Sequence, residues 1–221
     1  MRPSLPRLLL VLTAEAGLVD AVSYLKLGHV FVANMTGNVV FLGFSIGGAS
    51  GLSTLASLVA IASFLIGAMA GGRLAATYRD DLAQLLANGM VAQLALVAAA
   101  AIVAALAGVH GSASRYLLIV LLASAMGTQT AVARGVGVRD LPTTVLTQTL
   151  AGLASEARFP DVTSDPLFRR RLLSVAAMLL GALVGALLVL NVASWTAIAL
   201  AAVLVGGVAA TAGTADLEAS R

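Results

Sequence analysis

Two acidic residues, Glu15 and Asp20, stand inside the first apolar stretch of this 221-residue chain. A carboxylate in the middle of a membrane helix is costly, so it normally faces a polar partner or a wet cavity. A spacing of five residues sets the two side chains about 140° apart on a helix, so they do not form one bidentate site. Asp20 could pair with Lys26 near the far end of the stretch. We predict that both carboxylates serve substrate binding or proton coupling, the structural alternative being buried interhelical hydrogen bonds.

The composition predicts that these carboxylates lie in a membrane. Hydrophobic residues make up 60% of the chain and charged residues only 10%, which a soluble domain of this size could not hide from water. The basic residues are scattered between apolar stretches and form no basic face, so nucleic acid is not an expected partner. With two histidines, no cysteine and no glycine-rich phosphate loop, we expect no metal, no cofactor and no enzyme activity.

Apolar stretches long enough to cross a bilayer occur about six times. They lie near residues 8–27, 52–76, 82–108 and 115–133, and twice between residues 171 and 216, with a hinge at 191–194. Two further stretches, 34–48 and 142–155, are too short for a comfortable crossing, because about 15 helical residues rise only about 22 Å. We expect these two to be re-entrant half-helices that enter and leave the membrane on one side.

The openings of the half-helices are rich in neutral polar side chains. A helix N-terminus offers free N–H groups and a positive dipole end, which attract anions or carboxylates. Gly37 would permit close backbone approach. The alternative is that these side chains only cap the broken backbone, since lipid cannot satisfy it. The predicted substrate-binding or coupling residues come from the first apolar stretch, from the two half-helix openings and from the second-half segment that corresponds to the first stretch. They are Glu15, Asp20, Asn34, Thr36, Gly37, Asn38, Gln129, Thr130, Thr147 and Gln148.

Landmarks recur along the chain at a shift of about 110 to 114 residues. Gly17 and Asp20 correspond to Gly127 and Thr130, the segment 34–38 corresponds to 145–149, and the glycine pair 67/71 corresponds to 181/185. We therefore predict one membrane domain built of two repeats, 1–110 and 111–221. Each repeat would hold three crossings and one half-helix, and an odd number of crossings makes the two repeats inverted, as in many secondary transporters.

The positions of the basic residues predict the orientation of the chain. With both termini on the cytoplasmic side, every Lys and Arg except Lys26 and Arg115 lies inside, as the positive-inside rule requires. If both short stretches crossed fully, several arginines would move outside.

Two further predictions concern packing: the small-xxx-small glycine pairs should allow close helix approach, and Asn88 and Gln93 should make interhelical hydrogen bonds.

Several of these segments resemble a known family. The runs 17–25, 27–31 and 34–38, and later 126–129 and 140–147, look like the signature of the YoaK-type bacterial multi-pass membrane proteins, a family of unknown function. The likeness covers roughly residues 8–212. It implies a multi-pass protein of the bacterial inner membrane and no assigned substrate. Gln148 and Thr149 depart from the Gly-Asn that the family tends to have there.

The sequence favours an all-α secondary transporter of a small polar or anionic solute, with a midplane site between the two half-helix N-termini and Glu15 or Asp20 carrying a coupling proton. One alternative is a passive channel of the same fold, which needs no titrating group. The other is a non-transporting membrane assembly module, in which both carboxylates would be paired with Lys26, Arg134 or backbone. The expected partners are the lipid bilayer and a small molecule or ion, and a homo-oligomer stays open.

Overall fold

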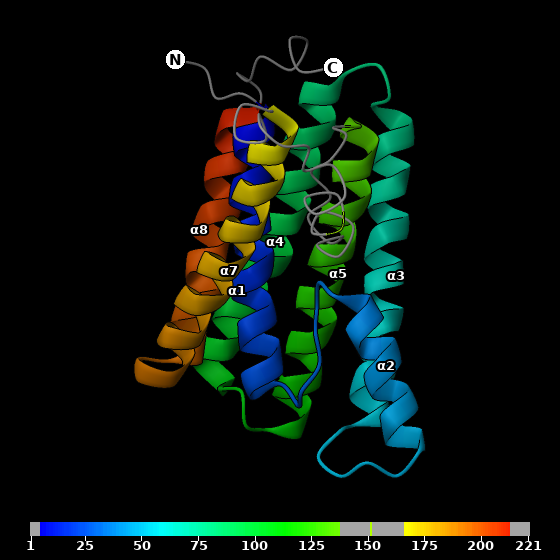
Figure 1. Cartoon of the computed structure of the whole chain (residues 1–221), viewed down its shortest axis with the longest axis vertical. Helices are drawn as coiled ribbons and strands as arrows, with labels where there is room; N and C mark the ends of the chain where they lie inside the picture. Colours follow the sequence, from blue (N-terminus) through cyan, green and yellow to red (C-terminus); the bar gives the residue numbers. More distant parts are fainter. Residues whose placement is uncertain (1–4, 138–150, 152–165, 213–221) are drawn as a thin grey trace.

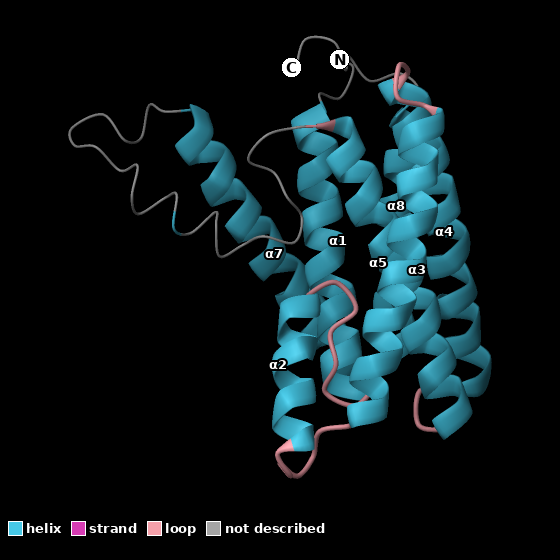
Figure 2. Cartoon of the chain, turned by 90° about the vertical axis from the view of Figure 1, so that its right-hand side faces the viewer, coloured by secondary structure: helices cyan, strands magenta, loops and turns pink. Residues whose placement is uncertain are grey.

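The computed structural model describes residues 5–137, 151 and 166–212, and this part of the chain is all helical (Figures 1 and 2). The helices, in chain order, are α1 (Leu5–Lys26), α2 (Met35–Ile46), α3 (Thr54–Thr77), α4 (Leu82–Ala107), α5 (Ser112–Val136), α7 (Pro166–Asn191) and α8 (Ser194–Ala212). All of them except α2 contain a window long and apolar enough to span a membrane. Within the described ranges, the predicted all-α fold with six helices long and apolar enough to span a membrane is therefore confirmed.

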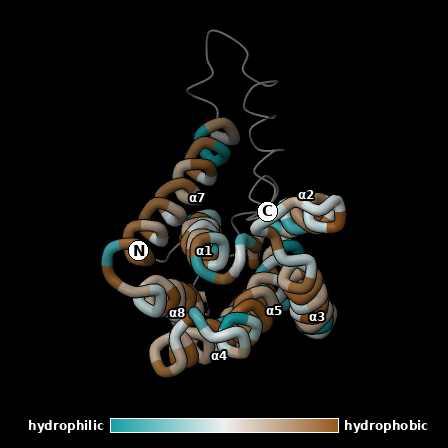
Figure 3. Tube along the Cα trace, turned by 90° about the horizontal axis from the view of Figure 1, so that it is seen from below, coloured by the Kyte–Doolittle hydropathy of each residue, from teal (hydrophilic) through white to brown (hydrophobic). Residues whose placement is uncertain are grey.

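The helices form a bundle around two inner members, α1 and α5. Most of α1 and α5 is buried inside the protein, whereas the other four long helices bury a third of their spanning window or less. As Figure 3 shows, α7 and α8 lie on one side of the bundle with α1, and α3 lies on the other side with α5. Helix α4 packs against both α5 and α8 and so joins the two sides.

Glycines bring the paired helices together in two interfaces of the same design. A side chain at Gly71 of α3 would meet the Thr128 carbonyl of α5 at 2.6 Å, and one at Gly185 of α7 would meet the Leu18 carbonyl of α1 at 2.7 Å. The other matched contacts are Gly17 with Met178 and Gly127 with Phe64, and Gly181 with Ala14 and Gly67 with Ser124. Small residues here let backbones touch, as the predicted packing role requires.

The same offsets relate every one of these contacts. A shift of 110 residues converts Gly17 into Gly127, and a shift of 114 converts Gly71 into Gly185. In Figure 1 the related helices run in opposite directions, α1 downward and α5 upward, α3 upward and α7 downward. Such exchanged contacts are what an inverted repeat would produce.

Helix α2 is half as long as its neighbours. After α1 ends at the lower end of the bundle in Figure 1, the segment 27–34 climbs back beside it, and α2 then descends to the same end. Its 12 residues rise about 18 Å, too little for a crossing. The observed bounds agree with the predicted short helix at 34–48. The second predicted short helix, 142–155, lies outside the described residues.

Charge is unequally divided between the two ends of the bundle. Of the nine described Lys and Arg residues, only Lys26, which ends α1, and Arg115, in the first turn of α5, belong to helix ends that lie at the lower end of the bundle in Figure 1. The other seven lie near the helix ends that face the upper end: Arg7, Arg73, Arg79, Arg134, Arg169, Arg170 and Arg171.

Candidate functional site

Glu15 belongs to a polar cluster formed by side chains from three helices. Its side chain is fully buried, as are those of Gln93 on α4 and Gln129 on α5. Gln93 Nε2 donates one hydrogen bond to Glu15 Oε2 at 3.3 Å and another to Gln129 Oε1. These three residues, which we call the Glu15 cluster, link the first helix to two helices that are far away in sequence.

The hydrogen bonds of Gln129 determine how the whole cluster is oriented. Its Nε2 donates to the Leu12 carbonyl at 3.2 Å, so its Oε1 must face Gln93. Gln93 must then present its NH₂ group to both Gln129 and Glu15, because an amide oxygen there would face two acceptors. Two buried oxygens are left with no donor, Glu15 Oε1 and Gln93 Oε1. Orphaned buried acceptors of this kind are uncommon and call for a physical cause.

Asp20 is engaged in a different way. Its Oδ1 accepts hydrogen bonds from the backbone N–H groups of Val32 at 2.9 Å and Ala33 at 2.8 Å. These amides belong to the segment between α1 and α2, where Gly28 and His29 have positive φ values of 100° and 56° and end the helix. Asp20 therefore satisfies the broken backbone, which corrects the expected pairing with Lys26.

Asn38 and Gly37 complete the support of this segment. The Asn38 side chain is fully buried and pairs with the Phe31 backbone, accepting from its N–H at 2.8 Å and donating to its carbonyl at 2.6 Å. A side chain at Gly37 would meet the Phe31 ring at 2.7 Å. That ring stacks on Tyr24 and Phe41. In the described structure, the space at Gly37 is thus taken by an aromatic ring.

The remaining predicted residues of the first half lie at the surface of the described structure. Asn34 is the N-cap of α2, yet its side chain makes no capping hydrogen bond, contrary to the expected helix-terminus chemistry. Asn34 and Thr36 are both exposed. Because both residues are exposed whereas the Glu15 cluster is fully buried, neither belongs to that cluster.

Of the predicted site residues of the second half that the structure describes, Gln129 joins the Glu15 cluster and Thr130 does not. Thr130 is buried at the edge of the core and donates to the Met126 carbonyl of its own helix at 2.8 Å. Thr128 bridges two helices, donating to the Gly67 carbonyl at 3.1 Å and to the Ser124 carbonyl at 3.0 Å. Thr147 and Gln148 lie outside the described residues, so the proposed meeting of the two half-helix openings stays a prediction.

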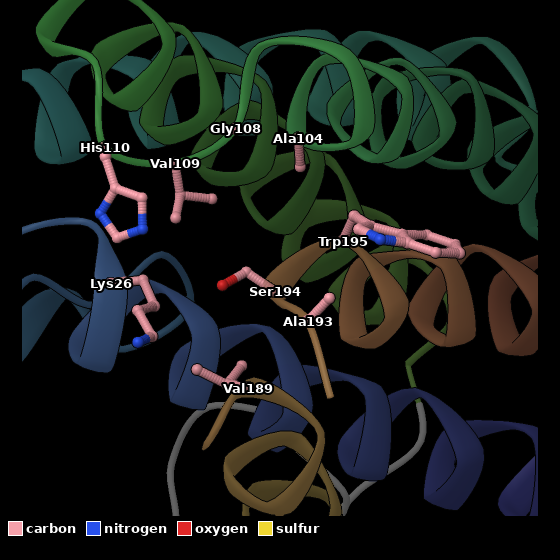
Figure 4. A pocket seen from close by; sticks show the side chains of 9 residues that line it. All are labelled: Lys26, Ala104, Gly108, Val109, His110, Val189, Ala193, Ser194 and Trp195. Atoms are coloured by element: carbon pink, nitrogen blue, oxygen red, sulfur yellow. The ribbon is translucent and has the colours of Figure 1, made fainter. Parts of the chain in front are cut away.

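A pocket of about 300 Å³ opens at the lower end of the bundle and is shown in Figure 4. Lys26 from the end of α1, His110 from the turn before α5 and Ser194 from the start of α8 face the same space, with Trp195 at its margin. None of the lining residues is acidic, and none belongs to the predicted site. Within the described ranges, no group of three or more acidic or histidine side chains could hold a metal ion.

Sequence reasoning assigned Gln93 an interhelical hydrogen bond and left it out of the site. The hydrogen bond is confirmed, but its partner is Glu15, so Gln93 belongs with the predicted carboxylate. The available signal was an amide near the middle of a helix that carries no charged residue. Asn88, by contrast, donates to Gln84 of its own helix and is exposed, so its expected interhelical bond is absent.

Comparison with known proteins agrees with the resemblance noted in the sequence. Residues 8–211 match the family model described as "Protein of unknown function (DUF1275)". The chain is 37% identical over 150 residues to the "UPF0700 transmembrane protein YoaK" of Bacillus subtilis (strain 168). That match covers 67% of this chain and 65% of the relative, so the chain spans just under two thirds of the relative's length. No solved structure matches. With six apolar spanning helices and a family match along nearly its whole length, the chain is a multi-pass membrane protein that belongs to the DUF1275 family.

Proposed function

We propose that this protein is a proton-coupled secondary transporter of a small polar or anionic solute, with Glu15 at its coupling site. The observation that carries the proposal is the Glu15 cluster: a fully buried carboxylate at the junction of α1, α4 and α5, with one oxygen lacking a donor. Intramembrane ionisable groups are costly and typically mark ion or proton pathways. Helix packing alone does not explain a carboxylate at this position, because one of its two buried oxygens makes no hydrogen bond in the described structure.

The repeat architecture supports the same proposal. Exchanged glycine contacts and oppositely directed helix pairs fit two inverted halves, the plan on which many transporters alternate between inward and outward access. Helix α2 and the segment before it fit a re-entrant element, since both ends of that element lie at the lower end of the bundle (Figure 2). Irregular backbone at membrane depth occurs where protein or a cavity covers it.

Charge supports both the orientation and the solute class. The end with seven arginines fits the cytoplasmic side of a bacterial inner membrane, and in that orientation α1 would begin and α8 would end on the cytoplasmic side. The lower pocket would then open outside. Lys26 and His110 without a carboxylate in its lining would favour the approach of an anion.

A non-transporting assembly module is the second candidate. It is favoured by Asp20, whose hydrogen bonds to Val32 and Ala33 are those of a backbone cap. Under this reading Glu15 would also serve only helix packing. The two candidates differ in whether the protein moves a solute.

Proton flux in proteoliposomes tests the proposal. Vesicles loaded with a pH-sensitive dye would be exposed to small carboxylates, phosphate, sulfate and neutral polar solutes, one at a time. We expect at least one solute to cause saturable acidification or alkalisation that Glu15→Gln abolishes. Unsaturable flux that is independent of the proton gradient would instead indicate a channel. If no solute in the panel moves protons, the assembly module is the better description.

A further inference from the structure

Buried acceptors in the Glu15 cluster lack the donor that their arrangement demands. In the described part of the chain, Gln93 Oε1 and Glu15 Oε1 both have no hydrogen-bond donor, although the two side chains are joined by a hydrogen bond through their other polar atoms. Reversing the Gln93 amide would not help, since Gln129 Oε1 holds the Gln93 NH₂ group in place. The donors of the cluster therefore leave two of its acceptors without a hydrogen bond.

Among the described residues, no cation faces Glu15 from the helices packed around it. Helices α4 and α8 contain no charged residue. On α5, Arg134 is exposed, and Arg115 lies about 21 Å along the helix from Gln129. On α7, Arg171 precedes Gly181, the residue that contacts Ala14, by about 15 Å of helix.

The remaining charges on α1 itself do not neutralise Glu15 either. Arg7 and Lys26 lie about 12 and 16 Å away along the helix. Asp20 is another acid, and its Oδ1 is already held by two backbone amides. An isolated carboxylate in such surroundings is strongly disfavoured relative to the neutral acid.

We propose that Glu15 is a proton-binding site at neutral pH, in which the bound proton supplies the missing donor and Gln93 and Gln129 are positioning residues. Protonation of the carboxylate by water-borne H⁺ forms one O–H bond and leaves a neutral acid. That O–H makes Glu15 Oε1 a donor, and its proposed acceptor is Gln93 Oε1, on the side chain that is already hydrogen-bonded to Glu15. A metal cation fits less well, because hard divalent cations seek six or more oxygens and Glu15 is the cluster's one carboxylate.

The same geometry separates the two carboxylates that the sequence left equivalent. Asp20 receives two backbone N–H donors, an arrangement that satisfies an ionised oxygen. Glu15 receives a single amide donor for its two oxygens. The structure thus assigns the exchangeable proton to Glu15 and the backbone-capping role to Asp20. That this proton is the coupling ion of transport rests on the proposed function, whereas proton binding by Glu15 does not require transport.

Infrared difference spectroscopy on the full chain in liposomes tests the inference directly. We expect the C=O stretch of a protonated carboxylic acid at neutral pH, lost in Glu15→Gln and retained in Asp20→Asn. Gln93→Leu should move the band to higher frequency, because the acid loses its hydrogen-bond partner. The Gln93→Leu measurement also keeps the test decisive if Glu15→Gln does not fold.

Two results would overturn the inference. One is a spectrum without a protonated-acid band at neutral pH, and the other is a band that disappears in Asp20→Asn but persists in Glu15→Gln. The inference and the proposed function fail separately. A Glu15 band without solute-driven proton flux supports the proton site and contradicts the transport function. Flux without the band supports the transport function and contradicts the proton site.

Discussion

Neighbouring glycines on α3 provide a matched test of how closely the two halves pack. At Gly71 an added methyl group would lie 2.6 Å from the Thr128 carbonyl and 2.9 Å from the Ala131 side chain, whereas at Gly72 it would meet nothing within 4 Å. Ordinary contacts begin near 3.4 Å, so Gly71→Ala requires α3 and α5 to separate by about 0.8 Å. The separation would also stretch the 3.1 Å hydrogen bond from Thr128 to Gly67.

The free energies of unfolding of the two variants should therefore differ. Overpacking costs about 1–3 kcal/mol, and a weakened interhelical hydrogen bond in a membrane protein costs about 0.6 kcal/mol. Replacing helical glycine by alanine contributes up to about 1 kcal/mol in favour of both variants. We expect Gly72→Ala to be unchanged or up to about 1 kcal/mol more stable, and Gly71→Ala to be about 2–3 kcal/mol less stable than Gly72→Ala.

Detergent-based unfolding can measure this difference. The protein in mild detergent micelles would be titrated with a denaturing detergent, and helix content would be followed by circular dichroism. Equal midpoints for Gly71→Ala and Gly72→Ala would refute the close contact between α3 and α5. Because both substitutions change the same residue type one position apart on one helix, local helix propensity cannot account for a difference between them.

Three further predictions concern the repeat, the broken backbone and the orientation. Gly185→Ala should lose about as much stability as Gly71→Ala, because its added methyl would lie 2.7 Å from the Leu18 carbonyl; a loss well under half as large would contradict the exchanged design. Asp20→Ala should cost about 2–5 kcal/mol by leaving two buried amides without an acceptor, and should speed hydrogen exchange in residues 27–38. Asp20→Asn, which keeps an acceptor, serves as its control, and equal exchange in the two variants would argue against capping. Since the chain has no cysteine, single cysteines can report the orientation: those at Ala49 and His110 should react with an impermeant maleimide in intact cells, and one at Arg79 only after permeabilisation. If instead Arg79 is labelled in intact cells and Ala49 only after permeabilisation, a re-entrant α2 in the proposed orientation is excluded.

Asp20 and Glu15 illustrate how far residue type alone could carry the assignment of a site. Both are acids in an apolar stretch, and both are buried in the structure. Their roles differ because of what lies opposite each one: two backbone amides for Asp20, and a single side-chain amide for Glu15. Helix periodicity tells on which face of its own helix a side chain lies, but it does not tell which groups of a neighbouring helix lie opposite that side chain.

The six spanning helices and the short helix α2 could be read from the sequence by itself. Hydropathy is a local property, and a bilayer requires about 20 apolar residues for each crossing, so composition and length suffice. The break after α1 was equally local, marked by Gly28 and His29 and by the polar opening of α2. The recurrence of glycines at constant offsets also lay in the sequence, although their contact partners did not.

Tertiary structure alone decided which polar groups meet. Gln93 reaches Glu15 across 78 residues of chain and Gln129 across 36, and Asn38 pairs with the backbone of Phe31 instead of facing a ligand. Within an apolar bundle, side-chain pairing depends on helix rotation and on the close approach that glycines permit, and neither is encoded in a local window. The sequence determined that a membrane helix carries two carboxylates, and packing determined that one holds the backbone while the other is left short of a donor.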